Sequence, residues 1–423
     1  RGGLVPGPAA PRRRISGVSG TEKQIGPALA MAIVAGNMIG SGVFLLPAVL
    51  ASVGSASLIA WGVAAVIAVA LALVFACLGG MRDGTESLTE YPGTAFHPAL
   101  GFLAWAAYWA SCFIGVVGIA VVAAGYGAAI FGVKLEAVPR LIAILALLWV
   151  LVGCAMMGPR FVGRMSSATL AIGLAPIAAA IVIGFSGFDA DVFAASWNVS
   201  GEPLGVALPP TLISIFWAFL GLESANAIAG RVRHPKRNIA IAAAGGVGLA
   251  AVVYALATAA LFGLMPAAAL AASTAPFADV IGSVAGSAAG VAVACAAFAR
   301  TVGCTAGWIL VGGETGQAGG RRGFLPKALS STTPGAAPVR DLIVMGVLMS
   351  LVALLTVSPD LVKQFSLISD LTVYLILSVY VLCALALVRF SGSINGQGLR
   401  WSTRGLGVAG AAAAAWVAWA AAA

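Results

Sequence analysis

The chain contains eleven apolar stretches of roughly the length that crosses a membrane, about 20 residues for a helix. They lie near residues 25–49, 54–80, 98–131, 138–157, 166–188, 205–230, 238–264, 282–315, 339–357, 364–389 and 404–422. Hydrophobic residues make up 61% of the chain and charged residues only 9%, whereas soluble domains carry about 25% charged residues. Because a membrane segment must satisfy its own backbone polar groups, these stretches predict helices. We therefore expect an all-α integral membrane protein.

Lysine and arginine are distributed unevenly among the loops between these stretches. If the N-terminus is cytoplasmic, nineteen of the 23 lie on the cytoplasmic side, and only Lys134, Arg140 and Lys363 lie in outer loops. Cytoplasmic loops of membrane proteins carry this excess of positive charge. The net charge of +9 therefore indicates topology in a lipid bilayer, and we expect no nucleic-acid partner.

The two ends of the chain differ from its middle. Residues 1–25 are rich in Pro, Gly and Arg and lack apolar periodicity, which predicts a disordered cytoplasmic tail. We expect a helical core over residues 26–390, with halves near 26–190 and 204–390. Residues 391–423 are expected to form a loop and the start of peripheral helices. Because the sequence begins without Met and ends within an Ala-rich apolar run, we expect a fragment that lacks a twelfth span.

The first apolar stretch is interrupted at residues 36–42, Gly-Asn-Met-Ile-Gly-Ser-Gly. Glycines disfavour a continuous helix, and unwound backbone is tolerated at membrane depth only where it is buried in protein or lines a polar cavity. The amides of Ser41 and Gly42 can then receive an anion, and the carbonyl of Met38 can receive a cation. An α-amino acid carries both groups. Alternatively, the glycines let a neighbouring helix approach closely.

A second interruption falls in the sixth stretch, where Gly221 and Glu223 lie in the middle of the span. The two interrupted stretches are five spans apart and, from the loop charges, run in opposite directions. This pattern predicts an inverted five-helix repeat with broken helices 1 and 6 and a binding site near the midplane. For Glu223 we expect a functional carboxyl that couples substrate occupancy to protonation, and the alternative is a neutral acid bonded to a backbone carbonyl.

The sequence lacks the patterns of catalytic and metal sites. Its two histidines, His97 and His234, stand beside prolines, and its six cysteines are scattered singly along apolar stretches. No triad, paired metal-ligand spacing or phosphate-binding loop is present in the sequence. We therefore expect no enzyme activity, no metal and no cofactor.

Two motifs resemble the signature regions of the amino acid, polyamine and organocation transporter superfamily. They are Gly-Asn-Met-Ile-Gly-Ser-Gly-Val-Phe at 36–44 and the segment from Trp217 through Glu223 to Asn238. The similarity is strongest to the bacterial basic amino acid/polyamine antiporters, particularly the arginine/agmatine antiporters. It extends to shorter motifs at Tyr108-Trp109, 196–201, Gly307-Trp308 and 324–326. The resemblance implies a LeuT-like fold in a bacterial inner membrane and exchange by alternating access. It also implies that the protein can form a homodimer.

The resemblance also implies roles for residues at matching positions. The amides of Ser41 and Gly42 would hold the substrate carboxylate, and the carbonyls of Met38, Trp217 and Leu220 would hold the amino group. Trp217 would act as an outer gate and Trp308 would receive a guanidinium on its face. An inner gate would consist of Tyr108, Glu223 and Tyr380. The remaining predicted substrate-binding residues are Asn37, Ile39, Ser111, Cys112 and Thr372. Without the resemblance, both tryptophans would be read as packing residues or interface anchors.

Three departures from the family pattern affect the predicted site. Val116 stands where the antiporters place an Asn near the guanidinium, and the segment 89–96 replaces a Gly-Gly-x-Tyr-x-Tyr element. Asp370 precedes Thr372, where the family pattern has no acid. Arg300 is a further charge within a span, and two alternatives remain open for it, a structural pair with Asp370 or a role with the substrate.

These patterns predict a secondary transporter that exchanges a cationic amino acid such as arginine for its decarboxylated amine, agmatine. The fifth stretch has no Lys where some superfamily members carry a protonatable amine, which favours exchange. The first alternative is proton-coupled uptake of neutral or diverse amino acids. A channel or a non-transporting sensor is the alternative from another class.

Overall fold

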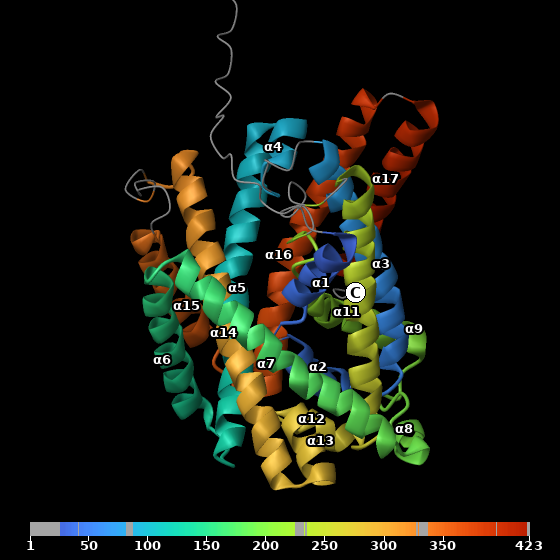
Figure 1. Cartoon of the computed structure of the whole chain (residues 1–423), viewed down its shortest axis with the longest axis vertical. Coiled ribbons are helices and arrows are strands. Elements are labelled where there is room, and N and C mark those ends of the chain that lie inside the picture. The colour runs from blue at the N-terminus through green and yellow to red at the C-terminus, as the bar shows by residue number, and fades with distance from the viewer. Residues whose placement is uncertain are drawn as a thin grey trace, which may run out of the picture.

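The computed structural model describes residues 26–40, 42–81, 88–224, 232, 235–326, 329, 337–394 and 396–420. Its regular elements are helices (Figure 1), as expected for an all-α membrane protein. The predicted tail over residues 1–25, the predicted site residue Ser41, and residues 225–230 of the sixth stretch lie outside the described residues.

The helices follow the predicted stretches closely. The long ones are α3 (Ser57–Met81), α5 (Pro98–Ile130), α6 (Ala137–Met156), α7 (Pro159–Ser186), α11 (Pro235–Phe262), α14 (Ser287–Arg321), α15 (Val339–Leu355), α16 (Leu361–Phe390) and α17 (Gln397–Ala420). The shorter ones are α1 (Pro27–Met38), α2 (Gly42–Leu50), α4 (Tyr91–Ala95), α8 (Ala190–Ala195), α9 (Leu204–Ala218), α12 (Ala267–Ala271), α13 (Pro276–Ala285) and the 3₁₀ helix η3 (Ser391–Ser393).

Among the described residues, seven helices are long and apolar enough to cross a membrane, and the bent pair α1–α2 makes an eighth candidate. The predicted stretches near 205–230, 339–357 and 404–422 also contain helices, namely α9, α15 and α17. However, α9 has 15 residues and α15 has 17, less than the roughly 20 that a span needs. The structure therefore fits an integral membrane protein, while the count of eleven spans stays a prediction.

Both predicted interruptions are present at the expected places. Helix α1 ends at Met38 and α2 begins at Gly42, with a bend of 57° between them. Helix α9 ends at Ala218 and continues into a turn in which Gly221 has a φ of +104°. This left-handed conformation suits glycine, because a Cβ would be strained there. The inverted relation of the two halves stays a prediction.

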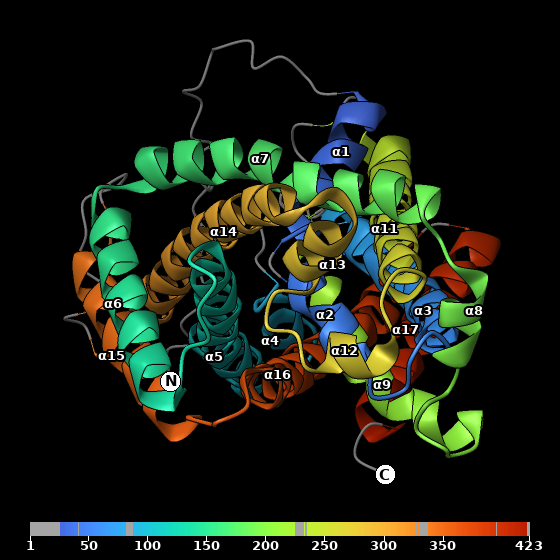
Figure 2. The ribbon, with the colours of Figure 1, turned by 90° about the horizontal axis from the view of Figure 1, so that it is seen from below.

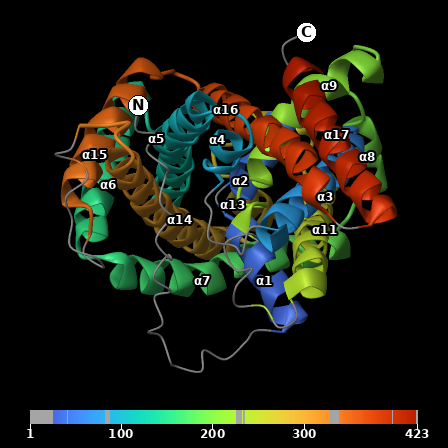
Figure 3. The same ribbon diagram turned by 90° about the horizontal axis from the view of Figure 1, so that it is seen from above.

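The helices are arranged around α5, α14 and α16. Seen end on, α6 and α15 lie together on one flank, while α3, α11 and α17 lie on the other (Figures 2 and 3). Helix α14 packs along α5 on one side and α7 on the other. Close packing of α7 and α14 depends on Gly303, because a Cβ there would lie 1.8 Å from Thr169 Oγ1. Small residues commonly let membrane helices approach in this way.

Loops at one end of the bundle are tied together by backbone bonds. The amide of Ser55 donates to the carbonyl of Ser196 over 3.0 Å, and the amide of Val199 donates to the carbonyl of Val53 over 3.0 Å. The sequence did not predict α12 and α13, which connect α11 to α14. Here the Ala267 amide donates to Ser196 Oγ over 3.1 Å. The segment 196–199 therefore joins the α2–α3 turn to the start of α12.

Replacement of Gly54 tests this junction. Gly54 has a φ of +89°, and a Cβ there would lie 1.9 Å from the Ser196 carbonyl oxygen. Since backbone strain of this kind costs about 1–3 kcal/mol and the contact adds to it, Gly54→Ala should lower the melting temperature of the detergent-purified protein. Gly62→Ala is the matched control, because the space around Gly62 is open. Equal melting temperatures for both variants would contradict the junction.

Candidate functional site

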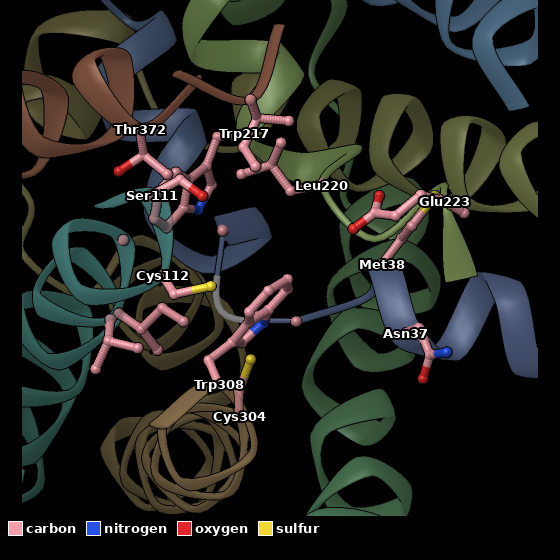
Figure 4. Close-up of a pocket in the computed structure, with 16 residues that line it drawn as sticks. Asn37, Met38, Ser111, Cys112, Trp217, Leu220, Glu223, Cys304, Trp308 and Thr372 are labelled. Atoms are coloured by element: carbon pink, nitrogen blue, oxygen red, sulfur yellow. The ribbon is translucent and has the colours of Figure 1, made fainter. Parts of the chain in front are cut away.

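A cavity of about 50 Å³ lies where the two interrupted helices meet. It has room for a few water molecules. Figure 4 shows its lining, to which α1, α5, α9, α14 and α16 all contribute. The lining residues are Asn37, Met38, Gly40, Gly42, Ser111, Cys112, Gly115, Val116, Ile119, Trp217, Leu220, Glu223, Cys304, Trp308, Thr372 and Ile376.

Most of the predicted site residues are brought together in this lining. They are Asn37, Met38, Gly42, Ser111, Cys112, Trp217, Leu220, Glu223, Trp308 and Thr372. The side-chain amide of Asn37 points away from Trp308 (Figure 4), so only its backbone faces the α1 break. Ile39, Tyr108 and Tyr380 are not part of the lining, and Ser41 lies outside the described residues.

Several lining residues were not predicted as site residues, among them Gly115, Ile119, Cys304 and Ile376. Each lies one or two helical turns from a residue that was predicted. Positions 111, 115 and 119 share one face of α5, as do 304 and 308 on α14 and 372 and 376 on α16. Because residues four apart stack on one helix face, extending the predicted positions by that spacing finds these neighbours. Val116, which replaces the Asn of the family pattern, also lies in the lining.

The end of α1 presents backbone carbonyls, as the glycine pattern predicts. The Ile39 amide donates to the Ala35 carbonyl over 2.8 Å, and the Gly40 amide donates to the Met38 carbonyl over 2.6 Å. A carbonyl oxygen has two lone pairs, so that of Met38 can accept a second hydrogen bond from a ligand. The Ile39 carbonyl already accepts from Arg300 at 2.9 and 3.2 Å. The Ile39 carbonyl is thus occupied by Arg300, and Ile39 is not part of the cavity lining.

The ring of Trp217 closes one wall of the cavity by packing onto glycines. A Cβ at Gly42 would lie 2.3 Å from Trp217 Cδ1, and Cβ atoms at Gly115 and Gly118 would lie 3.5 and 3.2 Å from Trp217 Cη2. The ring meets Phe365 edge-on, with centroids 5.5 Å apart. Gly42 thus admits the ring of Trp217 beside the cavity. The alternative for the glycines, the close approach of a neighbouring helix, is not what this contact with a side chain shows.

Glu223 is held at the opposite wall by two donors. The Tyr380 hydroxyl donates to Glu223 Oε2 over 2.6 Å, and the Gly221 amide donates to the same oxygen over 3.1 Å. Tyr380 is fully buried and packs edge-on against Phe75, with centroids 4.9 Å apart. The predicted partners Glu223 and Tyr380 thus touch. In the alternative for Glu223, a neutral carboxyl group donates to a backbone carbonyl. In the structure, its oxygen Oε2 instead accepts from a hydroxyl and a backbone amide.

The suggested pair of Arg300 and Asp370 is not formed. Arg300 Nη2 donates to the carbonyls of Ile39 and Gly36, over 2.9 and 3.5 Å. Asp370 Oδ1 accepts from Ser214 Oγ over 3.0 Å. The physical reason is that α1 ends beside Arg300 and offers it carbonyls, whereas α9 offers Asp370 a hydroxyl. The spacing of residues along one helix does not show which neighbouring helix supplies the hydrogen-bond partner of Arg300 or Asp370.

Comparison with known proteins identifies relatives over most of the chain. The model of the family described as amino acid permease matches residues 25–422. The putrescine transporter PotE of Escherichia coli (strain K12) is 34% identical over 352 residues, which cover 83% of this chain and 80% of that protein. The cadaverine/lysine antiporter of the same strain is 33% identical over 377 residues, 88% of this chain and 85% of the relative. PotE of Haemophilus influenzae is 33% identical over 355 residues, 83% and 81% of the two chains.

By their names, these bacterial relatives are transporters of putrescine and an antiporter of cadaverine and lysine, and they are not enzymes. Their kinship and the membrane-length helices indicate a multi-pass protein of the bacterial inner membrane. The match to the family model covers far more than half of the chain, and it includes every element around the cavity. The chain therefore belongs to the amino acid permease family of the amino acid, polyamine and organocation transporter superfamily.

Proposed function

We propose that this protein exchanges a cationic amino acid for its decarboxylated amine by alternating access. The observation that supports the proposal best is the cavity between the two helix breaks. Its lining combines the end of α1 at Met38, the glycine that begins α2 at Gly42, and the indole ring of Trp308. One relative is named a cadaverine/lysine antiporter, and this pair consists of an amino acid and its decarboxylation product. We carry this type of exchange over to the present chain as a proposal.

The head of an amino acid fits the broken helix α1–α2. The amides at the start of α2, at Ser41 and Gly42, would bind the carboxylate, since helix N-termini favour anions. The carbonyls of Met38, Trp217 and Leu220 would accept from the amino group, since half-helix C-termini favour cations. Decarboxylation removes only the anion and leaves the amino group. An amine product would therefore keep half of the head contacts, which suits exchange.

Trp308 would bind the distal cation of the substrate on its ring face. In Figure 4 its indole points into the cavity beside the thiols of Cys112 and Cys304. The sequence predicts arginine and agmatine as the pair. However, a guanidinium carries five donors and an ammonium three, and buried Val116 adds no acceptor to the lining. The missing acceptor at Val116 favours a substrate with fewer donors, and one relative is named for cadaverine and lysine. Lysine and cadaverine are therefore the pair to be tested beside arginine and agmatine.

Both sides of the cavity would have to open in turn during exchange. Its volume of about 50 Å³ is well below the roughly 300–1,000 Å³ of small-molecule pockets. Trp217 would open toward one side as the outer gate. On the other side, Glu223 and Tyr380 would separate as the inner gate opens. Tyr108, the third residue predicted for this gate, is half-buried.

Counterflow in proteoliposomes tests the proposed exchange. We expect uptake of labelled arginine or lysine only when the lumen contains an amino acid or amine substrate. Proton-coupled uptake, which the half-buried carboxyl of Glu223 makes the second candidate, would instead load empty vesicles under an inward proton gradient. A channel would show flux that does not saturate, and a sensor would show binding without flux.

Two substitutions in the α1–α2 break test the carboxylate site. Gly42→Val should abolish amino acid binding, because the added carbons would block the anion and would push against Trp217, 2.3 Å from the Cβ position. Ser41→Ala should be mild, since the backbone amide rather than the hydroxyl would bind. Binding would be measured by scintillation proximity, with melting temperatures as a folding control. Small and equal effects would contradict this assignment.

Substitution of Trp308 tests the binding of the distal cation. Trp308→Leu should weaken the binding of cationic substrates by up to about 2 kcal/mol, the size of a desolvated cation–π contact. It should leave the binding of a neutral amino acid unchanged. Competition binding with arginine, lysine, agmatine, cadaverine and leucine would measure the effect. Uniform loss across these ligands would mean that Trp308 only supports the fold.

Substitution of Glu223 tests proton sensing at the inner gate. Glu223→Gln keeps an oxygen that can accept from Tyr380 but removes the ionisable group, so substrate binding should persist while turnover becomes less dependent on pH. Tyr380→Phe is the complementary control, because it removes the hydrogen bond that Glu223→Gln can keep and leaves the carboxyl titratable. Its exchange rate should still vary with pH. If Glu223→Gln keeps the pH profile of the unmodified protein, another group senses protons, and Asp370 is the next candidate.

A further inference from the structure

Arg300 is a buried charge in the membrane-spanning part of α14, with 5% of its surface exposed. Charged residues inside a membrane are rare, and they usually pair with an opposite charge or face an aqueous path. Within the part of the chain that the structure describes, no ion pair of Arg300 is found, and Asp370 bonds to Ser214 instead. Arg300 therefore needs another source of negative potential.

The end of the broken helix α1 supplies that potential. Arg300 Nε donates to the Ile39 carbonyl over 3.2 Å, and Nη2 donates to the carbonyls of Ile39 and Gly36 over 2.9 and 3.5 Å. The last carbonyls of a helix lack partners within it and carry the negative end of its dipole. The guanidinium, with its fixed fork of donors, thus acts as the counter-charge of α1.

The neighbouring helix is shaped to admit this side chain. A Cβ at Gly173 of α7 would lie 2.4–2.7 Å from Cβ, Cγ and Cδ of Arg300. The arginine stem therefore passes where α7 has no side chain. The contact of the Thr169 side chain with Gly303, one turn further along α14, holds the two helices at this distance. The position of the guanidinium is consequently fixed by α1, α7 and α14 together.

We propose that Arg300 is a tethered counter-cation that fills the place beside the α1 break where a free monovalent metal cation would otherwise bind. In transporters with broken helices, half-helix C-termini and unwound carbonyls coordinate the coupling ion. Here those carbonyls are occupied by a group that cannot leave. Substrate exchange by this chain accordingly needs no sodium. The inference deepens the proposed function, because it concerns the ion requirement of the same site.

Thermal unfolding in detergent tests the cation site without any substrate. Arg300→Ala removes the guanidinium and leaves a hole of the same shape, so low concentrations of guanidinium chloride should raise the melting temperature of this variant relative to choline chloride. Arg300→Met fills the hole with an apolar stem, and Arg321→Ala removes an exposed guanidinium from the same helix. Neither of these variants, nor the unmodified protein, should be stabilised. The same response in all four proteins would overturn the proposal.

Exchange in proteoliposomes provides the second readout. Arg300→Lys keeps the charge and should keep exchange, whereas Arg300→Met should slow it by roughly thirtyfold, the factor given by the strongest helix-dipole interactions. Replacing sodium with choline should leave the exchange rate of the unmodified protein unchanged. Equal rates for the Lys and Met variants, or a sodium requirement in the unmodified protein, would overturn the proposal. If Arg300→Ala does not fold, the Lys and Met variants still decide. If no substrate is exchanged at all, the proposed function fails, and the melting temperatures still test the cation site.

Discussion

The structure depends on one requirement of the membrane interior, a partner for each carbonyl freed where a helix stops. At the end of α1, Arg300 donates to the carbonyls of Gly36 and Ile39. At the end of α9, the Tyr254 hydroxyl donates to the Ala218 carbonyl over 3.2 Å. In both cases the donor comes from a different helix. Unsatisfied groups in hydrocarbon cost several kcal/mol, so these donors fix where α11 and α14 can lie.

The proposed gates at the two walls of the cavity differ in physical character. Trp217 is held by shape, since its ring fits over glycines and meets Phe365 edge-on. Glu223 is held by hydrogen bonds from Tyr380 and the Gly221 amide. Packing of an aromatic ring changes little with pH, whereas a carboxylate that accepts two hydrogen bonds changes when it is protonated. The two walls would therefore respond to different signals, substrate size on one side and proton concentration on the other.

The sequence predicted local features well and contacts between helices less well. Glycine spacing at 36–42 and the apolar lengths were sufficient to predict the breaks, because both depend on neighbouring residues. Helical periodicity extends Cys112 to Val116 and Trp308 to Cys304 on their own helices. The partner of Arg300 could not be predicted, because it depends on the relative height of α1 and α14 in the bundle. Short helices α12 and α13 were missed because their apolar runs are shorter than a span.

The contact of Arg300 with α1 has a consequence for the order in which the protein is made. The donor follows its acceptor, Ile39, by 261 residues in the chain. At about 5–20 residues per second, the ribosome adds that length in roughly 10 to 50 s. During this interval the α1 break exists without its guanidinium, and its carbonyls need water or the insertion machinery as partners. The contact that satisfies the end of α1 can therefore form only after α14 has been synthesised.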